Sequence, residues 1–365
     1  MKKVCIVTNH LQSGDGVCRA VINFANTLAE LGKYDITLFV LFKFDERYLA
    51  LFDKKIKTKH VFKIPCFKGL DRITSWWPPK LLYKKITKNE KFDIEIGFCW
   101  KNPTIAISNS INKEAKHLIY THGYSEGSKY YSKADMIVAI SSENVKRISE
   151  DINHSVPVVR FSNIFDEKGI MLQSEAAATI SKSKTKPLFI TVGRLSSEKG
   201  YMRMLEAALK LTNEGYRFNV WVVGDGPEKD IMNKYIIDNG LTRVVTMLGN
   251  QMNPYPYIKQ ADTLICSSFT EGYSTVCVES CILEVPVLTT KISGASDIIG
   301  DAEAGKIVDN SLDGIYEGMK YILENPEKVK SWKEKLKTSK VKFYKESRKK
   351  DLDNLLIKLE ELPNK

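Results

Sequence analysis

The stretch TLICSSFTEGYSTVCVESCILEVPVLTT, residues 263–290, contains the clearest indication of the fold class. A first apolar run ends at Ser268, a polar loop follows, and a helix is expected to begin near Ser274 or Thr275. A second apolar run, VPVLTT at 285–290, closes the stretch. Two short apolar runs joined by one helix are typical of parallel strands with a crossover helix. The stretch therefore predicts an α/β fold.

The same alternation extends over most of the chain. In the first half the predicted strands are VCIVT (4–8), ITLFVL (36–41), DIEIGF (93–98), HLIYT (117–121), MIVAI (136–140) and VPVVRF (156–161). In the second half they are LFITVGRL (188–195), NVWVVG (219–224), VVTMLG (244–249), TLICSS (263–268) and VPVLTT (285–290). Strands that alternate with helix-length segments in this way predict doubly wound parallel sheets.

Length and local composition divide the chain into two such domains. At 365 residues the chain exceeds the usual domain size of about 100 to 200 residues. Residues 166–187 are polar and end in Pro, which is typical of a linker. We expect one Rossmann-like domain at 1–165 and a second at 188–340, with a helix at about 341–365 packing back on the first. The carboxyl ends of both sheets are expected to face a shared cleft.

Composition and charge narrow the class of partner. Hydrophobic residues make up 43% of the chain, and this excludes a disordered protein. Lys and Arg number 55 and Asp and Glu 44, so the formal net charge is 55 − 44 = +11. A positive excess of this size favours anionic partners, which include nucleic acid, anionic lipid and phosphorylated small molecules.

The cysteines and the apolar runs indicate a compartment. No CxxC pair occurs among the seven cysteines, which is typical of a reducing environment. The apolar run that opens the chain ends at Thr8 and Asn9, too soon for a signal peptide, and no apolar run reaches 18 residues. We expect a cytoplasmic protein that does not span the membrane. The cysteines are Cys5, Cys18, Cys66, Cys99, Cys266, Cys277 and Cys281.

Two glycine-containing loops could hold phosphate groups. Gly16 precedes an amphipathic helix, whose N-terminus offers free N–H groups to an anion, although such a glycine also occurs for steric reasons alone. A dinucleotide fingerprint is excluded because Arg19 stands where its third glycine belongs. Arg194 and Lys199, in the loop after a later strand, could converge on a diphosphate or could form surface ion pairs.

The loop and helix after 268 carry two carboxylates. Glu271 lies in the loop and Glu279 about one turn inside the helix, and carboxylates accept hydrogen bonds from sugar hydroxyls. The helix N-terminus offers free backbone N–H groups that could hold a phosphate. They belong to Gly272, Tyr273, Ser274 and Thr275. Otherwise, Glu271 is only a favourable acid at a helix start and Glu279 a solvated residue.

The chain resembles the family 4 retaining glycosyltransferases, whose GT-B fold has two Rossmann-like domains facing across a cleft. Five features occur in the family's order and spacing: Gly16, GRLSSEKG (193–200), VVGDGP (222–227), MLGN (247–250) and EGYSTVCVE (271–279). The resemblance covers most of the chain and is densest over residues 188–310. It implies a hexosyltransferase that moves a sugar from a nucleotide sugar to a saccharide acceptor, often in the synthesis of capsule, exopolysaccharide, lipopolysaccharide or teichoic polymers. The first domain would bind the acceptor and the second the nucleotide-sugar donor.

The resemblance also implies roles for single residues. Glu271 would hold hydroxyls of the donor sugar and Glu279 the ribose, while Arg194 and Lys199 bind the diphosphate. The amides of residues 273–275 would assist. No metal or other cofactor is expected, because these cations and the helix N-terminus can stabilise the charge that grows on the leaving diphosphate.

Two positions in the first domain complete the implied site. His122, in IYTHG, matches the family's cleft-facing histidine near the donor sugar. Without the resemblance, it would be interpreted as an ordinary histidine at the end of a strand. Asp15 departs from the family, which often has Gly-Gly in the first loop. A carboxylate beside a diphosphate would be repelled, so we expect Asp15 to point away or to meet the acceptor.

The segment LDRITSWWPPKLLYKKITK, residues 70–88, has the composition of a helix that lies on anionic lipid. Trp76 and Trp77 stand beside Lys80, Lys84, Lys85 and Lys88, with Leu81, Leu82 and Ile86 expected to form an apolar face. The other interpretation is a helix that packs on its own domain. On the lipid interpretation, the protein is peripheral on the inner face of the plasma membrane and its acceptor is lipid-linked.

Two other functions fit part of this pattern. A nucleotide-sugar epimerase would share the GT-B fold, but GRLSSEKG and the paired glutamates favour the transferase. A basic nucleic-acid-binding protein would share the charge, but the chain has no RRM, KH or zinc-finger pattern. We therefore expect no nucleic acid partner.

Overall fold

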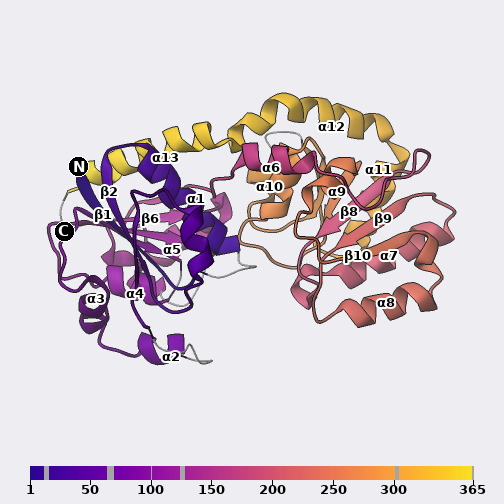
Figure 1. The fold of residues 1–365 in the computed structure, drawn as a ribbon. Helices are drawn as coiled ribbons and strands as arrows, with labels where there is room; N and C mark the ends of the chain where they lie inside the picture. The colour runs from indigo at the N-terminus through magenta and orange to yellow at the C-terminus, as the bar shows by residue number, and fades with distance from the viewer. Residues whose placement is uncertain (12–15, 64–69, 100, 124–127, 301–303, 364–365) are drawn as a thin grey trace. The chain divides into compact units, whose positions relative to one another are not determined.

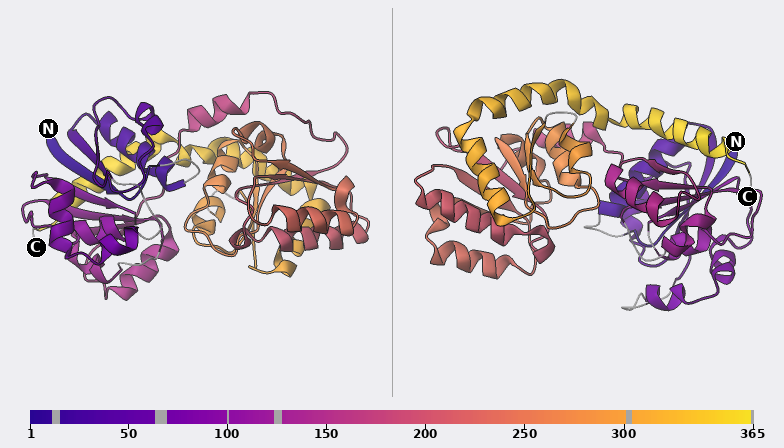
Figure 2. Two further views of the ribbon diagram at one scale, coloured as in Figure 1. Left: turned by 60° about the horizontal axis from the view of Figure 1, so that its bottom comes forward. Right: turned by 180° about the vertical axis from the view of Figure 1, so that it is seen from behind.

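The computed structural model describes residues 1–11, 16–63, 70–99, 101–123, 128–300 and 304–363 (Figure 1). Asp15 and Cys66 lie outside the described residues. The chain divides into two units: unit 1 comprises Met1–Phe165 and Lys345–Lys365, and unit 2 comprises Asp166–Tyr344. Each unit holds one parallel sheet with helices packed on it (Figure 2). The predicted fold class, α/β with two Rossmann-like domains, is confirmed.

The described part of unit 1 contains a parallel sheet of seven strands in the order β3-β2-β1-β4-β5-β6-β7. Its central strands are buried along nearly their whole length, as continuous runs of Val, Ile and Leu predict for strands covered on both faces. The strands are β1 (Lys2–Thr8), β2 (Tyr34–Val40), β3 (Lys57–His60), β4 (Ile94–Phe98), β5 (Lys116–Thr121), β6 (Met136–Ala139) and β7 (Val158–Arg160).

The helices of unit 1 cover this sheet. In α1 the apolar stripe that includes Val21, Phe24 and Leu28 is buried. The C-terminal helix α13 contacts α1 and β5, and Lys33 forms an ion pair with Asp353 at 2.7 Å. The helices are α1 (Gly16–Glu30), α2 (Leu70–Ser75), α3 (Pro79–Thr87), α4 (Asn102–Ile107), α5 (Ser142–Asp151) and α13 (Lys345–Glu361), with short 3₁₀ helices at Glu46–Leu51 and Ser128–Lys133.

The described part of unit 2 contains a parallel sheet of six strands in the order β10-β9-β8-β11-β12-β13. The strands are β8 (Leu188–Val192), β9 (Asn219–Val223), β10 (Val245–Gly249), β11 (Thr263–Cys266), β12 (Val287–Thr290) and β13 (Gly305–Val308). The helices are α6 (Glu167–Ser174), α7 (Tyr201–Asn213), α8 (Lys229–Asp238), α9 (Tyr255–Gln260), α10 (Thr275–Ile282), α11 (Leu312–Glu324) and α12 (Pro326–Ser339). Short helical turns lie at Ser197–Lys199, Leu241–Arg243, Ser296–Gly300 and Lys340–Phe343.

Three local features differ from the sequence expectations. Strands β3 and β13 were not predicted, since they are four-residue edge strands without a continuous buried run. Residues 166–187 are part of unit 2: α6 packs on α9, and Asn253 donates a hydrogen bond of 2.8 Å to Gln173 O. The expected apolar face on 70–88 is also wrong in part, because Leu82 and Ile86 are buried in the core of unit 1.

A buried charged cluster lies at the amino-terminal ends of the strands of unit 1. His117 Nδ1 lies 3.3 Å from Asp135 Oδ2, and His117 Nε2 lies 3.4 Å from Glu95 Oε2. Tyr83 donates a hydrogen bond of 2.6 Å to Glu95, whose side chain is fully buried. Burial alone would lower the pKa of His117, but the hydrogen bonds to Asp135 and Glu95 and their charges raise the pKa to about 9. The imidazolium is therefore the stable form at neutral pH.

This cluster predicts that unit 1 loses stability in mild alkali. Since the pKa of His117 is raised in the folded state, its contribution is complete below the ordinary histidine pKa of about 6.5 and is lost as pH rises through about 9. We expect the free energy of unfolding to fall by on the order of 3 kcal/mol across that window. Denaturant unfolding of wild type and His117→Gln measures this loss. The variant is expected to be less stable at pH 6.5 and to show a flatter profile.

A matched control is His154→Gln, since His154 is exposed in the same unit. An unfolding free energy of wild type that stays constant from pH 6.5 to 9 would contradict the assignment of a charged His117.

Candidate active site

The strand order of unit 2 changes direction between β8 and β11. From β8 the chain continues to β9 and β10 on one side, whereas β11, β12 and β13 lie on the other side. The loops that leave the carboxyl ends of β8 and β11 therefore diverge, and open α/β sheets bind ligands at such a switch point. The two loops touch here: Ser267 Oγ donates to Lys199 O at 2.9 Å and Phe269 N donates to Glu198 O at 2.9 Å.

Two glycines make the close packing at this edge possible. Gly200 has a φ of 63°, and a Cβ there would lie 2.4 Å from Ser267 O. Gly224 has a φ of 150°, and a Cβ there would lie 1.9 Å from Gly193 O. No other residue combines these backbone angles with such contacts. The glycines of GRLSSEKG and VVGDGP thus bring three loops together at the carboxyl edge of the sheet.

Lys199 and Glu271 meet across the two loops. Lys199 Nζ lies 2.7 Å from Glu271 Oε1, which also accepts a hydrogen bond of 2.8 Å from Ser268 Oγ. Burial alone would lower the pKa of Lys199, but the charge of Glu271 and the hydrogen bond to it outweigh burial and raise the pKa above its usual value. A fixed ammonium and a fixed carboxylate therefore stand side by side at the switch point.

Arg194 belongs to the same loop and is exposed. The neighbouring Glu198 accepts a hydrogen bond of 2.5 Å from Ser196 Oγ. This hydrogen bond lowers the pKa of Glu198, and the charges of Lys199 and Arg194 add to the effect. The loop after β8 thus presents two cations, one held by Glu271 and the other open to solvent.

Helix α10 begins where the sequence predicts. Its first residue is Thr275; Tyr273 and Ser274 are buried, whereas Gly272 is half-buried. Ser274 is the N-cap residue, but its side chain does not cap the helix and lies instead 3.7 Å from Cys266 Sγ. The partial positive charge of this helix end is therefore not offset by a side-chain cap.

Glu279 is held inside unit 2. Its side chain is 8% exposed, and Tyr255 Oη donates a hydrogen bond of 3.1 Å to Glu279 Oε1. The interpretation of Glu279 as a solvated residue is wrong, because the first turns of α10 are covered by α9. The sequence did not identify Tyr255 as a site residue. Only its contact with Glu279 in the folded unit distinguishes it from other core tyrosines.

Arg203 was also missed, although it fastens the loop that carries Glu271. Its guanidinium donates two hydrogen bonds to Ser267 O, at 3.1 and 2.6 Å, and one to Asn310 Oδ1 at 2.6 Å. The same group lies 3.7 Å from the centre of the Phe269 ring, and Asn310 Nδ2 donates to Phe269 O at 2.8 Å. Arg203 of α7 and Asn310, which follows β13, thereby hold the loop from two sides.

His122 follows β5 in unit 1. Its ring lies 4.9 Å from that of Phe98 and 5.0 Å from that of Tyr120, and both ring nitrogens are shielded from solvent. Burial lowers the pKa of His122 to about 4, against the opposing effect of the Asn163 side chain. His122 is therefore a neutral imidazole at physiological pH.

Gly16 is the first residue of α1, at the carboxyl end of β1. A Cβ at Gly16 would meet no described atom within 4 Å, so packing in unit 1 does not require glycine here. Gly16 and His122 belong to unit 1, whereas Arg194, Lys199 and residues 271–279 belong to unit 2. Within unit 2, the structure brings Lys199, Glu271 and the start of α10 together around one loop.

Known glycosyltransferases match large parts of the chain. Residues 161–339 match the family described as glycosyl transferases group 1. An N-acetylgalactosamine-N,N'-diacetylbacillosaminyl-diphospho-undecaprenol 4-alpha-N-acetylgalactosaminyltransferase of Campylobacter jejuni is 26% identical over 278 residues, 71% of this chain and 74% of that one. The lipopolysaccharide core biosynthesis glycosyltransferase LpsE of Rhizobium meliloti is 27% identical over 180 residues, 49% of this chain and 51% of that one.

Solved structures share the fold over nearly the whole chain. The apo form of the lipopolysaccharide outer core galactosyltransferase WaaB superposes with a TM-score of 0.75 at 17% identity, covering 98% of this chain and 99% of that one. Anabaena Alr3699/HepE in complex with UDP and glucose superposes with a TM-score of 0.73 at 16% identity, covering 98% and 100%. The chain is therefore a glycosyltransferase with the GT-B fold of two Rossmann-like domains, and its residues 161–339 match the group 1 glycosyl transferases.

Proposed function

We propose that this glycosyltransferase moves a hexosyl unit from a nucleotide sugar to a saccharide acceptor during the synthesis of a bacterial surface polysaccharide. The observation that carries the proposal is the contact between Lys199 and Glu271 at the switch point of unit 2. A cation can bind a diphosphate, and an adjacent carboxylate can accept hydrogen bonds from sugar hydroxyls. One small site can therefore bind both the diphosphate and the sugar of a nucleotide sugar.

The remaining residues of the proposed donor site surround this pair. Arg194 and Lys199 bind the diphosphate with the N–H groups at the start of α10, and Glu271 accepts hydrogen bonds from the donor sugar. Glu279, oriented by Tyr255, accepts them from the ribose. The buried hydrogen bond from Tyr255 supports this role because it fixes the carboxylate before the ligand arrives.

The proposed reaction needs charge stabilisation at the leaving group. Negative charge grows on the departing diphosphate while the anomeric carbon gains oxocarbenium character, and fixed cations at that place lower the barrier. Lys199 and Arg194 supply this stabilisation, so we propose a metal-independent reaction. The resemblance to the retaining family 4 enzymes supports retention of the anomeric configuration. His122, which the resemblance assigns to the vicinity of the donor sugar, is neutral and adds no charge there.

We propose a lipid-linked saccharide as acceptor. The Campylobacter relative is named for transfer to a saccharide on diphospho-undecaprenol. Among the described residues, no helix is long and apolar enough to cross a membrane.

Thermal unfolding with a panel of UDP, GDP, ADP and CMP sugars tests the proposed donor, followed by transfer assays with the sugar that protects. We expect one nucleotide class to raise the melting temperature and to support transfer at the same rate with and without EDTA. The metal-independent mechanism fails if EDTA abolishes transfer and Mg²⁺ restores it. Failure of every nucleotide sugar to protect would contradict the donor site.

The surface around α2 and α3 supports docking on an anionic membrane. Ile73, Trp76 and Leu81 are 46%, 73% and 56% exposed, and Arg72 stacks 5.6 Å from the Trp76 ring. Exposed apolar side chains beside a basic cluster match the headgroup region of an anionic bilayer. The basic residues are Lys80, Lys84, Lys85 and Lys88, all exposed. The buried side of α3 keeps this surface attached to the core through Leu82.

Replacing these four lysines by Gln is expected to abolish most sedimentation with vesicles that contain anionic lipid. Each basic residue near such a surface contributes about 1 kcal/mol, and high salt should have the same effect because it screens the attraction. Nucleotide-sugar binding is expected to remain. The matched control replaces four exposed lysines elsewhere in unit 1 by Gln: Lys54, Lys55, Lys113 and Lys146. Equal loss of sedimentation in both variants would contradict a local docking surface.

A further inference from the structure

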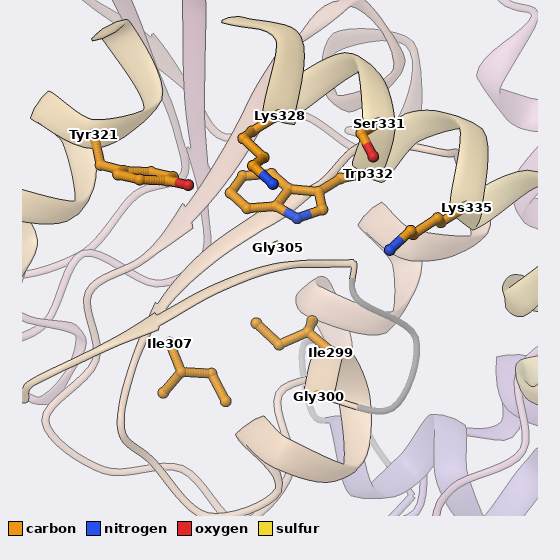
Figure 3. Close-up of a pocket in the computed structure, with 9 residues that line it drawn as sticks. All are labelled: Ile299, Gly300, Gly305, Ile307, Tyr321, Lys328, Ser331, Trp332 and Lys335. Carbon is orange, nitrogen blue, oxygen red and sulfur yellow. The ribbon is translucent and has the colours of Figure 1, made fainter. Parts of the chain in front are cut away.

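Unit 2 contains a pocket of about 400 Å³ on a different part of its sheet from the candidate active site. The pocket borders β13, the edge strand that lies two strands beyond β11. Its walls come from β13, α11, α12 and the turn that ends at Gly300 (Figure 3). It is lined by Ile299, Gly300, Gly305, Ile307, Tyr321, Lys328, Ser331, Trp332 and Lys335.

The floor of the pocket is the outer edge of β13, which has no partner strand among the described residues. Val287 N donates to Ala304 O at 3.0 Å and Lys291 N donates to Val308 O at 2.8 Å, so residues 304 and 308 turn their carbonyls toward β12. Because backbone groups alternate along a strand, Gly305 and Ile307 direct theirs away from β12. Both residues line the pocket. The pocket therefore offers peptide donors and acceptors side by side.

Aromatic rings and cations form the opposite wall. The rings of Trp332 and Tyr321 lie 6.4 Å apart with an angle of 33° between them, and Lys306 Nζ lies 4.1 Å from the Tyr321 ring centre. Figure 3 shows Lys328 and Lys335 on either side of Trp332 along α12. Lys328 is exposed. An apolar ring face is thus combined with positive charge at the mouth of the pocket.

We propose that this pocket binds a sugar unit that carries an anionic group, either a carboxylate or a phosphate. The apolar face of a sugar ring packs on Trp332, the hydroxyls pair with the peptide groups of Gly305 and Ile307, and the anion meets Lys328. The volume lies at the lower end of the range of about 300 to 1,000 Å³ for ligand pockets, which suits one or two sugar units.

This proposal rests on the proposed function and extends it. A glycosyltransferase that builds an acidic polymer must hold a chain as well as a donor, and the pocket would bind one unit of that chain apart from the site of transfer. A nucleotide could also stack on Trp332. The strand edge favours a sugar, because its alternating N–H and C=O groups match hydroxyls, which both donate and accept.

Binding to the full chain can be measured calorimetrically with three probes: hyaluronan tetrasaccharide, which carries carboxylates; maltose 1-phosphate; and neutral chitotetraose. We expect one of the two anionic probes to bind at least tenfold more tightly than chitotetraose, and the one that binds identifies the anion. Absence of binding by both anionic probes overturns the proposal. Protection by nucleotide sugars, measured on the same protein, reports on the proposed function separately.

Two variants locate the binding. Trp332→Ala removes the stacking surface and Lys328→Glu reverses the charge, and each is expected to weaken binding of the anionic probe at least tenfold. Because Trp332 also packs against the core of unit 2, Lys328→Glu keeps the test valid if Trp332→Ala unfolds. The matched control is Lys330→Glu, an exposed position on the same helix that does not line the pocket.

Three outcomes would overturn the pocket assignment. One is equal loss of binding in Lys328→Glu and Lys330→Glu, and the second is unchanged binding in a folded Trp332→Ala variant. The third is UDP binding that Trp332→Ala abolishes and Glu271→Gln preserves, which would assign the pocket to a nucleotide.

Discussion

Replacing Glu271 by Gln is expected to lower the rate of sugar transfer by about 10²- to 10³-fold, the usual effect of removing one preorganised electrostatic contact to a transition state. Glu271 holds Lys199 at 2.7 Å, so the variant would lose both a contact to the donor sugar and the orientation of a cation. Steady-state kinetics with the protecting nucleotide sugar measure kcat and KM. The melting temperature should fall modestly, because Lys199 loses the charge that offsets its partial burial.

Glu198→Gln is the matched control, because this carboxylate belongs to the adjoining loop. Among the described side-chain contacts, Glu198 has a hydrogen bond only with Ser196. Its turnover should stay near that of wild type. Glu279→Gln should chiefly raise KM, since the proposed role of Glu279 is binding of the ribose. The donor-site assignment fails if Glu271→Gln and Glu279→Gln both keep wild-type kinetics.

Arg203→Met should lower both stability and turnover. The change leaves the buried Ser267 O without its donor, which costs about 1 to 3 kcal/mol, and it also removes the contact with the Phe269 ring. We expect the free energy of unfolding of unit 2 to fall by about 2 to 4 kcal/mol. The freed loop would also misplace Glu271, so kcat should fall by roughly 10- to 100-fold even where the protein is folded. Denaturant unfolding and steady-state kinetics measure the two effects.

Arg203→Lys separates positioning from packing. A lysine can keep one hydrogen bond to Ser267 O but cannot stack a planar group on Phe269 or bond two acceptors, so we expect partial recovery of kcat. The control is Arg217→Met, an exposed arginine of the same unit. Full activity in a folded Arg203→Met variant would show that the loop keeps its geometry without this residue.

Much of the fold and the family was predictable from the sequence. Continuous apolar runs such as VCIVT and LFITV indicate strands that are buried on both faces. The helix-length segments between them indicate crossover connections and hence a parallel sheet. The glycines of GRLSSEKG and VVGDGP mark places where backbones approach too closely for a side chain. Apolar runs and glycines reflect local requirements of the backbone, so they can be recognised in a short stretch of sequence. The helix start at Thr275 was predicted for the same reason.

Which side chains meet depends on the tertiary structure and could not be predicted from the sequence. Lys199 and Glu271 are 72 positions apart, and they touch because β11 pairs with β8 rather than with β10, its predecessor in the chain. Arg203 has no local motif, and its partners come from a loop and from the end of β13. Leu82 and Leu81 are neighbours of similar hydrophobicity, yet the first is buried and the second 56% exposed, because only one side of α3 faces the core. Strand order and helix rotation arise from packing across the whole unit, and no short stretch of sequence contains them.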